Sequence, residues 1–385
     1  MKKLLICKNK VTYRIINGEQ NIDKMTEVGE QVFKNESICI KQLTKDSLSL
    51  QGLSHLVEVV TNKDEVFNYI DRIASQTKDT SMMIDVAIEE NIIRKIFDDK
   101  RETSEHFFTV VYNIVDTVSG KSIANEFSVF DILNEYAYKN IIEKIQIELY
   151  WNKLNKIKCL DLPKKWIFSS AASGFFFHEC IGHLLEEEQF HISEFKKGDK
   201  LFNASINIFE NWEWENELDD LECTIETNIL LLKNGKIENI MSACLNGGSG
   251  NAYTQEPFIE PMARMNGMYV NSINAKDNIF IDVVEGIFIK EISSGEYNPL
   301  NGEIGLSVSK AYKIENGKLT KVYFPLSILF NISDLLENQI VLDKKYETVM
   351  SLCGKYGAVK KIKYTVPEMK VDWSNNGKFI TNRSF

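Results

Sequence analysis

Residues 177–188 read FHECIGHLLEEE, which combines two histidines with a glutamate in a short apolar run. His178 and His183 could supply two neutral nitrogen ligands to a zinc ion. Glu179 directly follows the first histidine and could act as a base for an attacking water. The pattern therefore favours metal-dependent hydrolysis over the alternative, a chance meeting of these residue types.

The spacing of the two histidines predicts a distorted helix. On a regular α-helix, residues four apart lie about 40° apart around the axis, whereas residues five apart lie about 140° apart. His178 and His183 are five apart, so a regular helix would keep them from sharing an ion. A π-bulge or an early helix end would bring them together, and Gly182 is the residue that most easily permits such a distortion.

The flanking residues predict that this helix is largely buried. A brief strand is expected at residues 166–168, and apolar side chains then surround the motif at Ala171, Ala172, Phe175, Phe176 and Leu184. Buried polar ligands need partners, which a metal would provide. The acidic run 186–188 is expected at the surface, although one of its members could accept a hydrogen bond from an imidazole N–H.

Composition excludes several classes of protein. A chain of 385 residues with 44% apolar residues can build two or three domains, or one large two-layer domain with additions, with substantial cores. Its net charge of -10 argues against direct nucleic-acid binding. Seven cysteines without a C-x-x-C pair indicate a reducing cytoplasm rather than a disulfide framework. The apolar run at the amino terminus is too short for a signal peptide, and no run is long enough to span a membrane.

The pattern along the chain predicts an α+β protein. Residues 1–160 are expected to form an α/β domain that includes a long helix. Its predicted strands lie at residues 11–16, 37–41, 107–115 and 123–130. Its predicted helices lie at residues 63–74, 92–96 and 131–158.

The rest of the chain is expected to contain the long metal-motif helix with a following loop, residues 161–215, and a β-rich domain, residues 216–385. Its predicted strands lie at residues 224–232, 236–242, 279–284 and 286–290. Asn234-Gly235 and Asn316-Gly317 predict two-residue hairpin turns. The glycine-rich run 247–251 lacks the lysine and spacing of a phosphate loop, so nucleotide binding is not expected there.

A zinc ion held by two histidines needs a third protein ligand and an open fourth position. Cys353 lies beside a flexible turn near the end of the chain and is a candidate thiolate ligand. A lone cysteine can equally be a small buried apolar residue. The spacing alone leaves both possibilities open.

Four ordered segments together resemble the TldD/PmbA metallopeptidases, long labelled modulators of DNA gyrase. Residues 178–186 resemble the family's H-E-x-x-G-H-x-x-E core, and residues 250–251 with 261–265 resemble its G-N and P-M-x-R-M block. Residues 311–317 and the C-G-K-x-G segment 353–357 complete the resemblance. It covers about residues 160 to 372.

The resemblance implies that His178, His183 and Cys353 bind zinc and that Glu179 is the catalytic base. It also implies an α/β amino-terminal domain, a β-rich carboxy-terminal domain and a dimer, formed with itself or with a related subunit. Members cleave short or unfolded peptides, including leader peptides of ribosomally made natural products. The PmbA side of the family generally lacks the metal motif, so this chain resembles a TldD-like, metal-bearing member.

Two departures leave the metal set intact: Asp219-Asp220-Leu221-Glu222 replaces the family's D-D-E-G, and Ala358-Val359-Lys360 follows the C-G-K-x-G segment.

The leading interpretation is a cytoplasmic zinc peptidase acting on peptides. A non-catalytic binding or scaffolding subunit is the rival. A zinc amidase acting on a modified peptide would use the same residues.

Overall fold

The computed structural model describes residues 2–16, 19–34, 37–43, 62–75, 82–116, 122–130, 135–159, 163–202, 205–210, 218–243, 248–355, 358–373 and 380–381. The chain divides into two compact units. The first contains residues 1–153 and 254–260, and the second contains residues 154–253 and 261–385. Both consist mostly of β-sheet with few helices.

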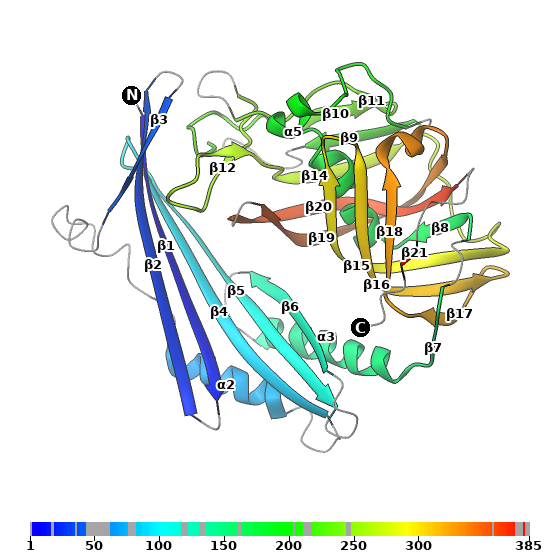
Figure 1. Cartoon of the computed structure of the whole chain (residues 1–385), viewed down its shortest axis with the longest axis horizontal. Coiled ribbons are helices and arrows are strands. Elements are labelled where there is room, and N and C mark those ends of the chain that lie inside the picture. Colours follow the sequence, from blue (N-terminus) through cyan, green and yellow to red (C-terminus); the bar gives the residue numbers. More distant parts are fainter. Residues whose placement is uncertain are drawn as a thin grey trace. The chain divides into compact units, whose positions relative to one another are not determined.

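In its described residues, the first unit is a six-stranded sheet in the order β3-β2-β1-β4-β5-β6, accompanied by helices α2 and α3 (Figure 1). Its elements are β1 (Lys2–Ile16), β2 (Glu19–Lys34), β3 (Ser37–Gln42), α2 (Lys63–Ala74), β4 (Met82–Phe97), β5 (Glu102–Asp116), β6 (Ser122–Phe130) and α3 (Glu135–Lys153). Every described pair in this sheet is antiparallel. Antiparallel neighbours need only short connections, so the unit is α+β rather than the predicted α/β.

The core of this unit lies between one face of the sheet and helices α2 and α3. Alternate residues of a strand point to the same face, and here that face contributes Val11, Ile84, Ile88 and Val110 to the core. The predicted apolar face of helix 63–74 packs against these strands through Val66, Tyr69, Ile70 and Ile73. The side chain of Asn62 caps this helix by accepting a hydrogen bond from the Asp64 N–H.

Strands 11–16 and 37–41, helix 63–74 and hairpin 107–130 are confirmed, although the turn of that hairpin lies outside the described residues. The predicted helix at residues 92–96 is wrong, because these residues lie in β4. Residues 90–95 of that strand are buried on both faces, which removes the two-residue alternation by which a strand is recognised. The helix predicted for 131–158 ends at Lys153 and is followed by a short strand, β7.

The segment 254–260 belongs to the first unit although it follows β12 of the second. Lys8 pairs with Glu256. The Gln31 side-chain amide donates to the Ile259 carbonyl at 2.8 Å, and the Gln255 amide donates to the Glu105 carboxylate at 3.2 Å. Polar side chains of the sheet thus hold this segment.

The second unit is built on a 13-stranded sheet whose main path runs β11-β10-β9-β14-β20-β8-β15-β16-β17-β7. Its strands are β7 (Lys156–Ile157), β8 (Lys165–Phe168), β9 (Ile206–Glu210), β10 (Ile229–Lys233), β11 (Lys236–Ile237), β14 (Gly267–Ser272), β15 (Glu285–Asn298), β16 (Glu303–Glu315), β17 (Lys318–Tyr323), β18 (Leu326–Asn331), β19 (Gln339–Lys355), β20 (Ala358–Asp372) and β21 (Ile380–Thr381). The pair β12 (Ala252–Tyr253) and β13 (Met262–Ala263) is separate. The helices in its described residues are α4 (Ser170–Phe177), a π-helix (His178–Gly182), α5 (Glu187–Ile192) and a 3₁₀-helix (Ile332–Leu336).

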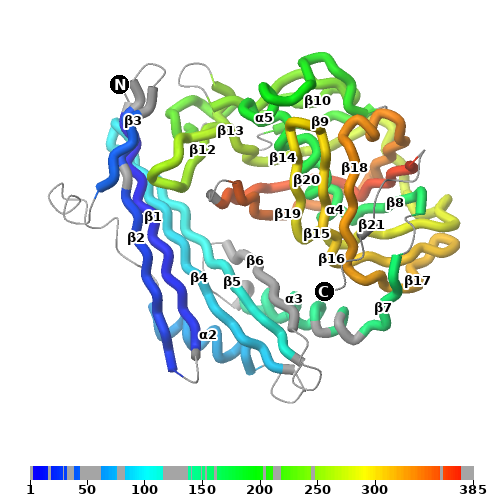
Figure 2. The backbone as a smooth tube through the Cα atoms, in the orientation of Figure 1, coloured from blue at the N-terminus to red at the C-terminus, as the bar shows by residue number. Residues whose placement is uncertain are grey.

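Helix α4 lies within the core of this unit, against β20 and β15 (Figure 2). Of the apolar residues expected to bury the motif, Ala172, Phe176 and Leu184 are buried as predicted, whereas Phe175 is partly buried and Ala171 is exposed. Segments far apart in the sequence therefore meet in space, because β19 and β20 come from near the end of the chain and the motif comes from its middle. This arrangement puts Cys353 within reach of the histidines.

Several expectations for this unit need correction. The long motif helix is short, because residues 183–185 form a turn and residue 186 pairs with Met241. The predicted strand 279–284 is a turn, since Ile279 and Val283 both enter a small apolar cluster and a turn brings side chains four apart to the same side. The predicted strands 224–232 and 236–242 are shorter in the structure, where they correspond to β10 (Ile229–Lys233) and β11 (Lys236–Ile237). The predicted middle segment, residues 161–215, lies inside the second unit.

Both predicted asparagine-glycine turns are confirmed. Asn234 and Gly235 have φ of 51° and 76°, and Asn316 and Gly317 have φ of 51° and 71°. Two successive residues with positive φ define the hairpin turn for which this dipeptide is favoured. These turns set the registers of β10 with β11 and of β16 with β17.

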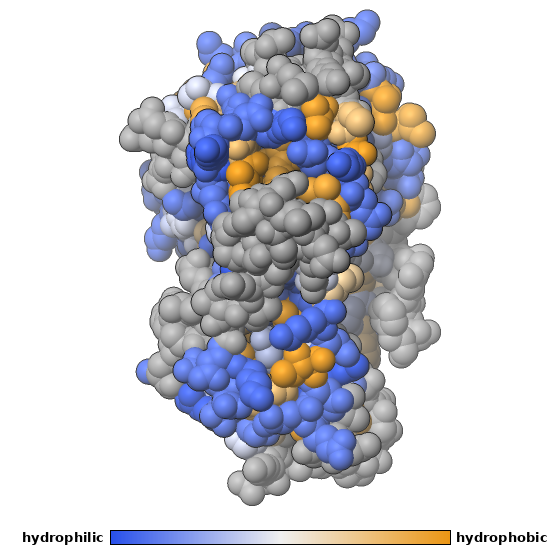
Figure 3. Space-filling model, turned by 90° about the vertical axis from the view of Figure 1, so that its left-hand side faces the viewer, coloured by the Kyte–Doolittle hydropathy of each residue, from blue (hydrophilic) through white to orange (hydrophobic). Residues whose placement is uncertain are grey.

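Among the described residues, none of the helices combines the length and the apolar character needed to cross a membrane. On the face drawn in Figure 3, hydrophilic residues surround smaller hydrophobic patches.

Candidate metal centre

The two motif histidines meet because the helix widens between them. Ser169 caps α4, since its hydroxyl accepts the Ala172 N–H at 3.2 Å. The helix then becomes a π-helix, and the His183 N–H donates to the His178 carbonyl at 3.1 Å, five residues back. The two imidazole rings lie 4.5 Å apart between centroids. The predicted π-type distortion is confirmed.

Gly182 serves this geometry by its small size. Its φ is not in the left-handed region, so backbone freedom is not the reason for a glycine. A Cβ at this position would lie 2.9 Å from Met265 Cε and 3.2 Å from His178 Nδ1. The glycine therefore leaves room for the first imidazole and for the methionine that packs against it.

Cys353 reaches the histidines from β19. Its Sγ is 3.5 Å from His183 Nε2, and one potential ligand atom from each of His178, His183 and Cys353 lies within 4.8 Å of the others. His178 Nδ1 faces Met265 Sδ at 3.4 Å, while His178 Nε2 is buried without a hydrogen-bond partner among the described residues. A buried nitrogen without a partner is costly, and a metal ion would satisfy it. The donor set therefore fits a metal.

The electrostatics of the group favour a thiolate. Burial by itself would raise the pKa of Cys353, but the imidazoles of His178 and His183 outweigh it and hold the pKa well below its ordinary value. Burial lowers the pKa of His183, but Glu186 and Cys353 outweigh this effect and raise the pKa well above its ordinary value. A thiolate is the form of cysteine that binds metals.

Glu179 lies beside this group. Its Oε2 is 3.9 Å from His183 Nε2, and its side chain is 8% exposed. Burial raises the pKa of Glu179, while the two histidines lower it in part. A carboxyl group with a raised pKa exchanges protons more readily near neutral pH than an ordinary glutamate does.

A second layer of charged residues lies behind His183. Glu186 is completely buried, and its Oε2 is 3.1 Å from His183 Nδ1 and 2.6 Å from Lys355 Nζ. Arg264 Nε is 3.8 Å from Glu186 Oε1, and the Arg264 guanidinium donates to the Cys353 carbonyl at 2.7 Å. Burial would raise the pKa of Glu186, but His183, Lys355 and Arg264 lower it to about 2.

Of the acidic run 186–188, the first member is buried, the second is partly buried and only the third is exposed as predicted. Glu186 is therefore the member of the acidic run that takes the alternative predicted role, as an acceptor for an imidazole N–H. Neither Arg264 nor Lys355 is predicted from the sequence to have a role at the site. Both lie inside the P-M-x-R-M and C-G-K-x-G blocks, which is the signal that could have found them.

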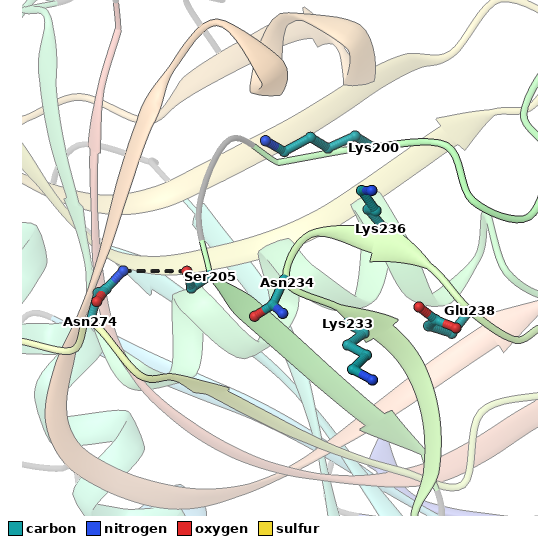
Figure 4. A pocket seen from close by; sticks show the side chains of 7 residues that line it. All are labelled: Lys200, Ser205, Lys233, Asn234, Lys236, Glu238 and Asn274. Atoms are coloured by element: carbon teal, nitrogen blue, oxygen red, sulfur yellow. Dashed lines mark hydrogen bonds between the residues drawn. The ribbon is translucent and has the colours of Figure 1, made fainter.

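A pocket of about 600 Å³ lies elsewhere in the second unit (Figure 4). It is lined by Lys200, Ser205, Lys233, Asn234, Lys236, Glu238 and Asn274. The Asn274 side-chain amide donates to the Ser205 hydroxyl at 3.3 Å. None of the motif residues lines this pocket, and its lysines are exposed.

A β-rich unit that brings two histidines, a cysteine and a glutamate to one point has the features of a metallopeptidase domain. Residues 165–374 match the model of the PmbA/TldA metallopeptidase C-terminal domain. The match covers more than half of the chain. The chain belongs to the TldD/PmbA family.

Curated relatives include proteins named metalloprotease TldD homolog. The one from Haemophilus influenzae is 26% identical over 216 residues, which cover 52% of this chain and 45% of that protein. The one from Buchnera aphidicola (subsp. Acyrthosiphon pisum) is 26% identical over 261 residues, which cover 60% of this chain and 53% of that protein. The chain therefore matches about half the length of these relatives.

Solved structures share the fold over nearly the whole chain. TldE from Thermococcus kodakarensis superimposes with a TM-score of 0.62 at 12% identity and covers 97% of this chain and 95% of its own. A protein from Thermotoga maritima described as a putative modulator of a DNA gyrase gives a TM-score of 0.63 at 14% identity, covering 96% and 94%. At these identities the likeness establishes the fold alone.

Proposed function

We propose that this chain is a zinc-dependent peptidase with Glu179 as its general base. The observation that carries the proposal is the convergence of His178, His183 and Cys353 on one point with Glu179 beside them. Two imidazole nitrogens and one thiolate form a three-ligand set suited to catalytic zinc, which keeps a fourth position open. When bound, zinc would supply Lewis acidity toward the scissile carbonyl and would acidify a water molecule.

The remaining steps belong to the residues of this chain. Glu179 accepts a proton from the attacking water and later delivers it to the leaving amine, and its raised pKa suits it to both transfers. The buried surroundings of Glu179 exclude bulk water from the carboxylate and strengthen its interaction with the histidines. The proposed substrates are short or unfolded peptides, among them leader peptides of ribosomally made natural products, as the family resemblance implies.

The rival function, a non-catalytic binding or scaffolding subunit, requires no metal chemistry. The two are separated by measuring the zinc content of the purified chain and its cleavage of a set of unstructured peptides, without any partner. We expect about one zinc per chain and metal-dependent cleavage. Protein purified without chelator that contains no transition metal would contradict the zinc peptidase.

Cys353→Ser tests the third ligand. A neutral hydroxyl replaces a thiolate in this variant, so we expect weaker zinc retention in a folded protein. Zinc occupancy after dialysis against a weak chelator measures this effect. Unchanged occupancy would leave Cys353 as a packing residue only.

The setting proposed for this activity is the cytoplasm. Cys39, Cys180 and Cys353 carry free thiols. Free thiols, one of them a proposed metal ligand, persist in a reducing compartment.

A further inference from the structure

We propose that Glu186, held by Lys355 and Arg264, is the positioning residue that orients His183 with its Nδ1 protonated and its Nε2 directed at the metal. This inference rests on the proposed zinc centre and assigns it a second layer of residues. Its starting point is the contact of 3.1 Å between His183 Nδ1 and Glu186 Oε2. A carboxylate oxygen only accepts, so the imidazole must donate from Nδ1.

The opposite nitrogen of His183 faces the other ligands. His183 Nε2 is 3.5 Å from Cys353 Sγ and 3.9 Å from Glu179 Oε2. If Nδ1 carries the proton, Nε2 offers a lone pair to a metal. A hydrogen bond from the outer nitrogen also restricts rotation of the ring.

The backbone around Glu186 explains why its side chain points inward. After the π-helix, the chain turns and pairs with residue 241: the Met241 N–H donates to the Leu185 carbonyl at 2.8 Å, and the Glu187 N–H donates to the Met241 carbonyl at 2.9 Å. Glu186 lies between these two hydrogen bonds and is completely buried. Its side chain therefore has little freedom to leave the histidine.

A buried carboxylate requires compensation, and two cations provide it. Lys355 Nζ lies 2.6 Å from the same oxygen that accepts from His183, and Arg264 Nε lies 3.8 Å from the other oxygen. Lys355 is two residues from Cys353 on β19, and Arg264 donates to the Cys353 carbonyl at 2.7 Å. One cation thus belongs to the strand that carries the thiolate, and the other is hydrogen-bonded to it.

The three charged residues therefore join the segments that carry the ligands. Glu186 follows the motif helix, Lys355 ends β19, and Arg264 follows β13. The arrangement fixes the distance between His183 and Cys353, which come from parts of the chain 170 residues apart.

Among the described residues, no carboxylate accepts a hydrogen bond from the other imidazole. His178 Nδ1 faces the Met265 sulfur at 3.4 Å, and a thioether is a weak acceptor. Packing against Gly182 and the Tyr364 ring, 5.6 Å away between centroids, orients His178 instead. We therefore expect the removal of polar neighbours to affect the orientation of the His183 ring and that of the His178 ring differently.

The first test measures zinc affinity by competition with a chromophoric chelator, without substrate, in Glu186→Ala and Glu186→Gln. The alanine variant removes the acceptor and should bind zinc about 10–100-fold more weakly. The glutamine variant keeps an acceptor oxygen and should lose less. Glu188→Gln is the matched control, because its exposed side chain accepts the Ala263 N–H at 2.9 Å, which a glutamine oxygen can also accept.

The second test needs no variant. In the chain labelled with ¹⁵N-histidine, NMR should show a protonated, hydrogen-bonded Nδ1 on His183.

An unprotonated Nδ1 would overturn the proposal, and so would wild-type zinc affinity in both Glu186 variants. If the wild-type chain binds no zinc, the proposed function fails, whereas the protonation of Nδ1 in the metal-free chain still tests the role of Glu186. If zinc binds and no peptide is cleaved, only the proposed activity fails.

Discussion

Glu179 is confined between the motif helix and the backbone of β15. A Cβ at Gly295 would lie 2.5 Å from Glu179 Cγ and 2.8 Å from Phe175 Cε1. Contacts this short cannot be relieved by a small adjustment, because the helix that carries both side chains is buried in the core. The strand thus comes close enough to fix the carboxylate only because residue 295 has no side chain.

Glu179→Gln should abolish peptide hydrolysis while the fold and the zinc remain. Glutamine keeps the size of the side chain but cannot accept the proton of the water, so the contribution of general-base catalysis, about 10²–10⁴-fold, should be lost. Turnover, zinc content and melting temperature are measured on one preparation. If Glu179 is instead a structural carboxylate, activity should fall only in proportion to the folded fraction.

Gly295→Ala should reduce turnover strongly with zinc still bound, because the added methyl group displaces Glu179 rather than a ligand. Gly305→Ala is the matched control: it lies on the neighbouring strand β16, and its Cβ would meet Leu329 Cδ1 at an ordinary 3.7 Å. Turnover and zinc content of the two variants are compared. Equal activity in both would show that Gly295 does not control the position of Glu179.

At the scale of secondary-structure elements, a buried polar cluster joins β9, β14 and β20. Glu210 at the end of β9 accepts from the Asn251 amide at 3.0 Å and from the Gly267 N–H at 3.4 Å. Lys360 of β20 donates to the side chain of Asn266, whose own N–H donates to Glu210. Burial raises the pKa of Glu210 from 4.5 to about 8, although these groups oppose the shift.

This shift predicts a pH dependence of stability. Between about pH 4.5 and 8 the folded chain retains a proton on Glu210 that the unfolded chain releases, so the free energy of unfolding should fall as pH rises through this window. Glu210→Gln mimics the protonated form and should remove this part of the pH dependence. Denaturant unfolding of both proteins at pH 5.5 and 8.5 measures the difference. If the difference in free energy of unfolding between the two proteins does not change with pH, the raised pKa of Glu210 is contradicted.

At the scale of the whole molecule, we expect a dimer whose contacts involve the second unit, as the family resemblance implies. The partner would be a second copy or a related subunit. Sedimentation velocity at micromolar concentration, with and without zinc, checks the self-association. A monomer under both conditions would exclude a homodimer at that concentration.

The sequence by itself determined the elements whose causes are local. The asparagine-glycine turns follow from the backbone freedom of two residues, and helix 63–74 follows from its apolar period. The π-type distortion followed from the separation of His178 and His183, because a regular helix cannot bring residues five apart to one point. Strand β4 was missed because burial on both faces hides the period of a strand.

Only the tertiary structure decided which distant residues meet at the metal centre. Spacing left Cys353 open and the family resemblance favoured it as a ligand, but its distance from His183 depends on the register of β19 with β20. The burial of Glu186 and its contacts with Lys355 and Arg264 depend on three separate segments packing together. Contacts between segments far apart in sequence are set by how the whole core is filled, and no local pattern records them.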